Sequence, residues 1–171
     1  MAERPLADVV GPNLRLLLVG LNPSPASAAS GIAFARAGNR FWPAALAAGI
    51  VSRDRDPHHA LAHHGVGFTD MVARVTSRAA ELTNDEFIEG AQRLDKLVAR
   101  LAPTVVCFVG ITGYRIAVDK HASLGWQQQL FAQRDTYVMP NPSGLNAHTN
   151  IAALAAHLRA AAGDRPDPTQ Q

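Results

Sequence analysis

Short apolar runs that end at glycine or proline constrain the fold of this 171-residue chain more than any other feature. The clearest are residues 14–19 and 104–109, and residues 135–139 and 67–72 are further candidates. A short segment that is apolar at nearly every position is typical of a strand covered on both faces. We therefore expect these segments to form a central sheet.

Helical patterns alternate with these runs, at residues 39–48, 84–101, 112–120 and about 146–162. Parallel strands need crossover connections, so this alternation favours a mainly parallel sheet with helices on both faces. We predict an α/β fold, a single-domain three-layer α/β/α sandwich.

Capping signals mark the ends of two of these helices. Thr83 stands three residues before Glu86, which is the spacing of a capping box. Asn146 is a candidate N-cap for the last helix.

The length and the apolar fraction of 47% suit one core and are too small for two. We expect a polar lead at residues 1–13, a domain at residues 14–162 and a tail at residues 163–171. The tail has nothing to bury, so we predict that it is disordered.

The charged residues indicate a nucleic-acid partner only weakly. Net charge is +2, and of the 16 basic residues only Lys96 and Lys120 are lysines. Arginine suits bidentate contacts to phosphate, but the same bias follows from genome composition.

The single cysteine and the lack of long apolar runs exclude several classes of protein. Cys107 lies inside an apolar run and is best explained as a small buried residue. One thiol cannot hold an iron–sulfur cluster or form an internal disulfide. No run approaches the roughly 20 apolar residues that span a bilayer, and no leader pattern opens the chain. We expect a cytoplasmic protein with no membrane contact.

Two similar motifs each place an asparagine where a predicted strand gives way to a loop. They are Gly-Leu-Asn-Pro-Ser at residues 20–24 and Asn-Pro-Ser-Gly-Leu-Asn at residues 141–146. Ligands bind at this edge of parallel sheets, so we expect Asn22 and Asn141 to line one site. An amide has donors and an acceptor, which suits a pyrimidine edge or a positioned water. The alternative is that Asn-Pro is an ordinary turn initiator.

Two apolar residues each have two explanations. Phe34 follows a loop of small residues, and its ring either stacks on a nucleobase, worth about 1–3 kcal/mol, or plugs the core. Leu145 sits at the tip of the second motif and is either a wedge that unstacks a duplex or a hydrophobic staple. Wedge and staple predict opposite burial for Leu145.

Asp70 and a group of histidines are the remaining candidates for chemistry. A carboxylate at a pocket can orient water or stabilise a developing cation, whereas more often such an aspartate caps a turn. His59 and His63 are four apart, which is a spacing for metal ligands on a helix. The segment lacks the glutamate of His-Glu-x-x-His, so we predict no metal.

Together these motifs resemble the mismatch-specific uracil and thymine DNA glycosylases, a branch of the uracil-DNA glycosylase superfamily. The resemblance extends from about Leu14 to Leu158. Besides both Asn-Pro motifs it rests on Asn-Arg-Phe-Trp at residues 39–42 and Gly-Val-Gly-Phe-Thr at residues 65–69. It implies DNA repair by hydrolysis of the N-glycosidic bond of uracil flipped out of duplex DNA, preferentially at G:U mispairs. The product is an abasic site, and no metal or other cofactor is needed.

The resemblance also implies roles for individual residues. Asn22 orients the attacking water, Phe34 stacks on the flipped base, Asn141 approaches its O2 and Leu145 opens the duplex. Asp70, singled out above, joins Asn22 as a catalytic candidate. The base-binding candidates are Leu21, Ser27, Phe34 and Asn141, and those that open the duplex and contact the opposite guanine are Ser143, Gly144, Leu145 and Asn146.

Four positions depart from the resembled pattern or choose between its branches. Ser24 replaces a glycine and Pro25 follows it, so we expect a changed pocket floor. Ser27 is the residue that resembles the uracil-preferring members, and alanine marks the thymine branch. Asp70 stands where the thymine branch carries an amide, which adds an acid and predicts a faster enzyme.

We therefore predict a monofunctional uracil-DNA glycosylase that acts as a monomer on double-stranded DNA in the nucleoid. One rival is a nucleotide-binding or damage-recognition protein of the same fold without hydrolytic activity. Another is a metal hydrolase built on the histidines.

Overall fold

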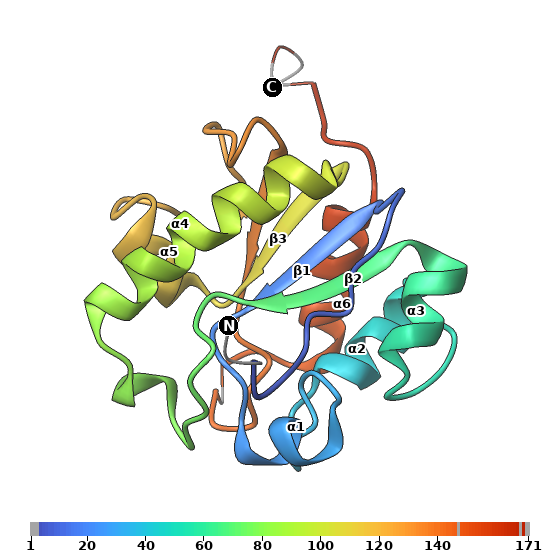
Figure 1. Ribbon diagram of the computed structural model, residues 1–171. Helices are drawn as coiled ribbons and strands as arrows, with labels where there is room; N and C mark the ends of the chain where they lie inside the picture. The colour runs from blue at the N-terminus through green and yellow to red at the C-terminus, as the bar shows by residue number, and fades with distance from the viewer. Residues whose placement is uncertain (1–3, 147, 168, 170–171) are drawn as a thin grey trace.

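The structure is a computed structural model that describes residues 4–146, 148–167 and 169. At its centre is a five-stranded sheet with the order β2-β1-β3-β5-β4 (Figure 1). Neighbours pair in parallel, except that the short edge strand β4 pairs with β5 antiparallel. The mainly parallel sheet is confirmed. Its strands are β1 (Leu16–Gly20), β2 (Val66–Asp70), β3 (Val105–Val109), β4 (Gly125–Trp126) and β5 (Asp135–Met139).

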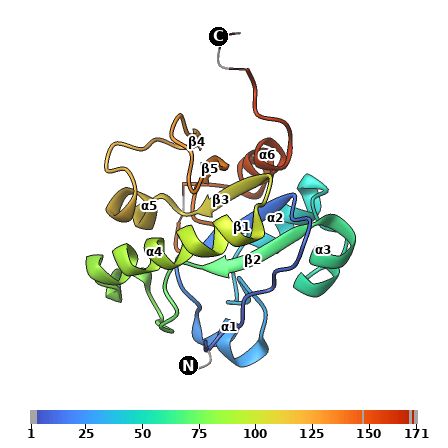
Figure 2. The ribbon, with the colours of Figure 1, turned by 45° about the horizontal axis from the view of Figure 1, so that its top comes forward.

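Helices cover both faces of the sheet, as Figure 2 shows, and the three-layer α/β/α sandwich is confirmed. A short helix, α1 (Pro25–Ser30), follows β1. One face carries α4 (Asn84–Leu101) and α5 (Ile111–Ala117). The other face carries α2 (Phe41–Ala48), α3 (Pro57–His64) and α6 (Ile151–Ala162).

The side chains of β1 explain why both faces are covered. Leu16 and Leu18 pack into the core beneath α2 and α6, and Leu17 and Val19 pack into the core beneath α4. Every residue of the strand is buried. Cys107 in the neighbouring β3 is buried as expected, and burial raises the pKa of its thiol.

The capping box predicted for α4 is confirmed. Thr83 Oγ1 accepts a hydrogen bond from the backbone N–H of Glu86, and the Glu86 carboxylate accepts one from the N–H of Thr83. The helix then buries one face against the sheet, formed by Phe87, Gly90, Ala91, Leu94, Leu97 and Val98.

The prediction for the start of the last helix is wrong. The N-cap of α6 is Asn150, whose Oδ1 accepts from the N–H of Ala153 at 2.8 Å. Asn146 instead donates its side-chain N–H to the backbone oxygen of Asn141 at 3.1 Å. The residues between β5 and α6 therefore form a longer loop, which folds onto itself before the helix begins.

The chain ahead of β1 packs against the domain. Val9 forms an isolated antiparallel bridge with Phe68 of β2, and both Leu6 and Val9 are buried. After α6, Arg165 contacts Asp135 at 3.0 Å. Residues 168, 170 and 171 of the expected tail lie outside the described residues, so its disorder stays a prediction.

No helix in the described part of the chain is both long enough and apolar enough to cross a bilayer.

Candidate functional site

A pocket lies where the chain leaves β1, β2 and β5. In Figure 1 the green segment after β2 and the orange segment after β5 turn toward the bottom of the view, where α1 lies. Asn22 follows β1, Asp70 ends β2 and Asn141 follows β5, and all three line the pocket. The fold thus brings the two Asn-Pro motifs into one site.

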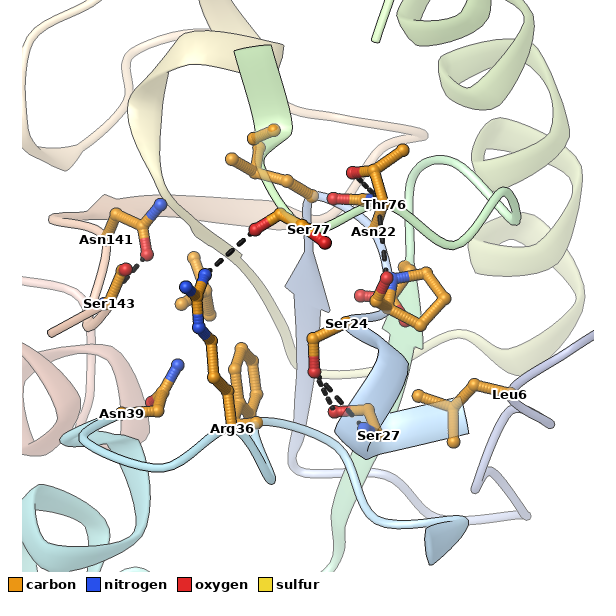
Figure 3. Close-up of a pocket in the computed structure, with 16 residues that line it drawn as sticks. Leu6, Asn22, Ser24, Ser27, Arg36, Asn39, Thr76, Ser77, Asn141 and Ser143 are labelled. Carbon is orange, nitrogen blue, oxygen red and sulfur yellow. Dashed lines mark hydrogen bonds between the residues drawn. The ribbon is translucent and has the colours of Figure 1, made fainter. Parts of the chain in front are cut away.

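The amide of Asn22 is held through its NH2 group. Nδ2 donates to Thr76 Oγ1 at 2.7 Å (Figure 3) and to the backbone oxygen of Arg74 at 2.9 Å. The Thr76 hydroxyl donates its proton to the backbone oxygen of Arg78, so the lone pairs of Thr76 Oγ1 are available to accept from Asn22. Oδ1 of Asn22 accepts no hydrogen bond from the described residues. An amide oxygen that is free to accept at a pocket wall can hold a water molecule.

The loop between β2 and α4 supplies these partners, and α4 anchors that loop. The Arg74 guanidinium binds Glu86 through two hydrogen bonds, of 2.7 and 3.0 Å. This contact, together with the cap at Thr83, lowers the pKa of Glu86 to about 2. The orientation of Asn22 therefore depends on the ion pair of Arg74, which lies 52 residues further along the chain.

Asp70 lies beside Gly20, its register partner in β1. A Cβ at position 20 would collide with Oδ1 of Asp70, so glycine makes room for the carboxyl group. Burial raises the pKa of Asp70 from 3.8 to about 7, against the opposing charge of Arg4. A pocket carboxyl group that titrates near neutral pH can both accept and return a proton.

The chain ahead of β1 contributes to the burial of Asp70. Leu6 lines the pocket, and Arg4 donates to the backbone oxygen of Asp70 at 3.2 Å. Arg93 of α4 donates to the same oxygen at 2.6 Å and pairs with Asp8 at 3.2 Å. The two arginines therefore hold the Asp70 main chain, while the side chain is left to the pocket.

Phe34 packs on the core and lines the pocket at the same time. Its ring stacks on Phe41 with centroids 4.3 Å apart and planes inclined by 28°. Its φ of 58° is uncommon for a bulky residue, and surrounding packing must maintain such a conformation. The ring is partly buried and packs on the core, and one part of it stays open to the pocket, so stacking on a base remains a prediction.

Two further amides lie on the side of the pocket away from Asn22 in Figure 3. Oδ1 of Asn141 accepts from the N–H of Ser143 at 3.0 Å, and Oδ1 of Asn39 accepts from the N–H of Phe41 at 2.9 Å. Their NH2 groups donate to none of the described residues. Each can therefore donate to a carbonyl oxygen of a flat ligand.

Ser24, which departs from the resembled pattern, is the N-cap of α1. Its Oγ accepts from the N–H of Ser27 at 3.1 Å. Ser27 is almost fully buried, and its Oγ also accepts from the N–H of Ala35. Both serines line the pocket, as does the largely buried Leu21. The part of the pocket floor around Ser24 is therefore formed by the start of α1.

Leu145 is 69% exposed, in the loop between β5 and α6. The hydrophobic-staple alternative requires burial and is wrong. Ser143 supports the tip, because its Oγ accepts from the N–H of Leu145 and its backbone oxygen accepts from the N–H of Asn146. Leu145, Ser143 and Asn146 line a shallow groove that continues from the pocket.

Several residues of the pocket wall were not predicted from the sequence. Arg36 donates to the backbone oxygen of Ser77 at 2.8 Å, and Figure 3 shows its side chain reaching across the pocket. Only Asn39 carried a local signal, since it opens the Asn-Arg-Phe-Trp segment. The others reach the site through contacts between distant loops. The polar residues missed are Arg36, Asn39, Thr76 and Ser77, and the apolar ones include Leu6, Ala79 and Val109.

The histidines lie on α3, and none of them lines the pocket. His59 and His63 stack with centroids 4.3 Å apart. Within the described ranges, no three His, Cys, Asp or Glu side chains are grouped so as to hold a metal ion.

A sequence comparison with known families matches residues 7–162 of this chain to the uracil DNA glycosylase superfamily. The matched range includes both Asn-Pro motifs and every pocket residue named above except Leu6.

Proposed function

Because this chain belongs to the uracil DNA glycosylase superfamily, we propose that it is a monofunctional uracil-DNA glycosylase. It hydrolyses the N-glycosidic bond of uracil flipped out of duplex DNA, preferentially at G:U mispairs, and leaves an abasic site. One observation carries the proposal. A free amide oxygen, a carboxyl group that titrates near neutral pH and an aromatic ring meet in one pocket.

The proposed reaction breaks the bond between C1′ of the sugar and N1 of uracil, and the electron pair leaves with the base. Asn22 Oδ1 holds the water whose oxygen bonds to C1′. The ionised Asp70 carboxylate accepts the proton that this water loses, and its charge stabilises the cationic sugar. The Asn22 amide and the Asp70 carboxylate are already held in position before the substrate binds, so little reorganisation is needed during the reaction.

The other wall of the pocket suits the leaving base. Phe34 offers a ring for stacking, and the free N–H groups of Asn141 and Asn39 can donate to the carbonyl oxygens of uracil. Negative charge develops on these oxygens as the bond breaks, so such donors stabilise the transition state more than the substrate. Ser27 supports a preference for uracil over thymine.

The exposed Leu145 supports a role in opening the duplex. A base can leave the stack only if something fills the gap, and an apolar side chain on a short loop is suited to that. The backbone groups of Gly144 and Asn146 then contact the widowed guanine. One chain carries every residue assigned here, which supports action as a monomer. We further propose that it acts on nucleoid DNA in the cytoplasm.

The direct test is base release from a duplex that carries one uracil opposite guanine. We expect strand breaks only after alkali treatment, because a monofunctional glycosylase leaves the backbone intact. If no breaks form while a known glycosylase cleaves the same duplex, the proposal is wrong. Binding to the mismatched duplex without base release would favour the non-hydrolytic rival.

A substrate panel tests the finer claims. Uracil, thymine and hypoxanthine are each placed opposite guanine and adenine, and base release is compared for the wild type and Asp70→Asn. We expect fastest release of uracil opposite guanine. Equal rates opposite adenine would overturn the preference for mispairs.

A further inference from the structure

Arg40 lies under the loop between β5 and α6 and binds four of its carbonyl groups. Its guanidinium donates to the backbone oxygens of Ser143 at 2.9 Å, of Asn146 and of Thr149. Its own backbone N–H donates to the oxygen of Pro142 at 2.9 Å. One residue thus fastens this loop on both sides of Leu145.

The backbone of the same loop presses on the chain just ahead of Arg40. A Cβ at Gly144 would lie 2.8 Å from the backbone oxygen of Gly38, so a larger residue does not fit there. Asn146 closes the loop by donating to the oxygen of Asn141. Leu145 projects from this closed unit, with 69% of its surface exposed.

The contacts of Arg40 are suited to fixing the conformation of the loop between β5 and α6. Its guanidinium does not line the pocket, and no carboxylate among the described residues lies within ion-pair distance of it. Hydrogen bonds from a charged donor are roughly twice as strong as neutral ones, and the planar fork holds several acceptors in a fixed geometry.

We propose that Arg40 is a positioning residue for duplex opening, which keeps the Leu145 loop in its inserting conformation before DNA binds. This inference rests on the proposed function. A preformed loop does not have to be ordered at the moment of binding, so less free energy is lost there. Asn141 lies in the same loop but only two residues after β5, so we expect it to stay in the pocket when the loop loosens.

The test compares two substrates in single-turnover cleavage. One is a G:U duplex, and the other is the same duplex with the uracil inside a bubble of unpaired bases, where little has to be pushed apart. We expect Arg40→Ala to slow cleavage of the duplex by about 10- to 100-fold, the loss typical of a group displaced by about an ångström. Cleavage in the bubble is expected to change much less.

A double-mutant cycle separates this role from a general structural one. Because Arg40 acts through Leu145, Arg40→Ala should add little to the duplex defect of Leu145→Ala. Arg55 also donates to a carbonyl group of the neighbouring loop, that of Ala35, so Arg55→Ala is the matched control and should leave the ratio of the two rates unchanged.

Equal losses on both substrates, or full additivity with Leu145→Ala, would overturn the inference. Thermal unfolding shows whether Arg40→Ala folds, and Arg40→Lys, with fewer donors, carries the same test if it does not. If the wild type releases uracil from neither substrate, the proposed function has failed. If it cleaves both and Arg40→Ala keeps the wild-type ratio, only the role of Arg40 is wrong.

Discussion

Asn22 and Asp70 line the same pocket but respond differently to pH. An amide does not titrate between pH 5 and 9, so its contribution is positional and constant. The Asp70 carboxyl group has a pKa of about 7 because it is buried, and its protonation state changes within the physiological range. The pH dependence of the reaction should therefore report on Asp70, and the removal of Asn22 should report on water placement.

Asn22→Ala should slow base release by about 100- to 1,000-fold, as when an oriented polar group is removed from a transition state. Affinity for a G:U duplex should stay close to that of the wild type, because the water is held most tightly in the transition state. Single-turnover cleavage and equilibrium binding measure the two effects. Asn84→Ala, at an exposed amide of α4, is the control. Comparable losses of rate and affinity would contradict the role.

The rate of base release should rise with pH through about 7 if Asp70 acts as a base, because only the ionised form accepts a proton. Asp70→Asn should be slow throughout and should lose this step. The measurement is a pH profile of single-turnover rates for both proteins. A step of the same size in Asp70→Asn would assign the titration to another group.

Asp70→Asn should also stabilise the fold at alkaline pH. The folded pKa of about 7 exceeds the ordinary 3.8, so the stability that comes with the protonated form is complete below about pH 4 and is lost as pH rises to about 7. The asparagine variant avoids this loss, which is at most about 4 kcal/mol. Unfolding in urea should show a stability difference between the two proteins that grows between about pH 4 and 8. A constant difference would mean that Asp70 is not desolvated.

At the scale of elements, α4 is the helix that holds the site in place. Glu86 binds Arg74 of the loop that orients Asn22. Gly90 lets the helix approach the backbone of Met71, where a Cβ would collide. Arg93 donates to the backbone oxygen of Asp70. These three helical residues are four and three positions apart, so they share one face.

Arg74→Ala should therefore slow base release while changing stability little. It releases the loop whose backbone and Thr76 hydroxyl hold the Asn22 amide, and we expect a loss of about tenfold in rate. Arg53→Ala, which removes a weaker exposed ion pair of 3.9 Å with Asp56 away from the pocket, is the control and should change neither rate nor melting temperature. The prediction is wrong if both variants keep the wild-type rate.

At the scale of the whole molecule, the net charge of +2 is small, so the placement of individual arginines matters more than the total. Arg36 lies between the pocket and the groove beside Leu145 and lines both. Its guanidinium is held only by the backbone oxygen of Ser77 among the described residues. It is thus available to a phosphate group next to a flipped nucleotide.

Arg36→Ala should weaken binding to a G:U duplex and make that binding less sensitive to salt. Loss of one phosphate contact lowers the slope of log K against log salt by about 0.9. Arg100 is exposed at the C-terminal end of α4, which leads into the start of β3, at the end of the strands away from the pocket, so Arg100→Ala should leave the slope unchanged. Titrations at several salt concentrations measure both, and an unchanged slope in Arg36→Ala would exclude the contact.

Elements with strong local signals were predicted well. The strand at residues 135–139 and the helix at residues 84–101 have the expected bounds, because apolar patterning and a capping box act within a few residues. The start of α6 was missed by five residues, because the helix is capped by Asn150 and the loop before it makes contacts with Arg40, more than 100 positions away. The two-residue β4 carries too little pattern to be predicted at all.

The sequence by itself determined the fold class and the placing of Asn22 and Asn141 at strand ends, because strand burial and turn chemistry are local and periodic. Only the tertiary structure decided how these groups are prepared. Thr76 meets the Asn22 amide, Gly20 admits the Asp70 carboxyl group, and Arg40 fastens the Leu145 loop. Those contacts join segments that are far apart in the chain, and the distances between them exist only once the strands have aligned in register.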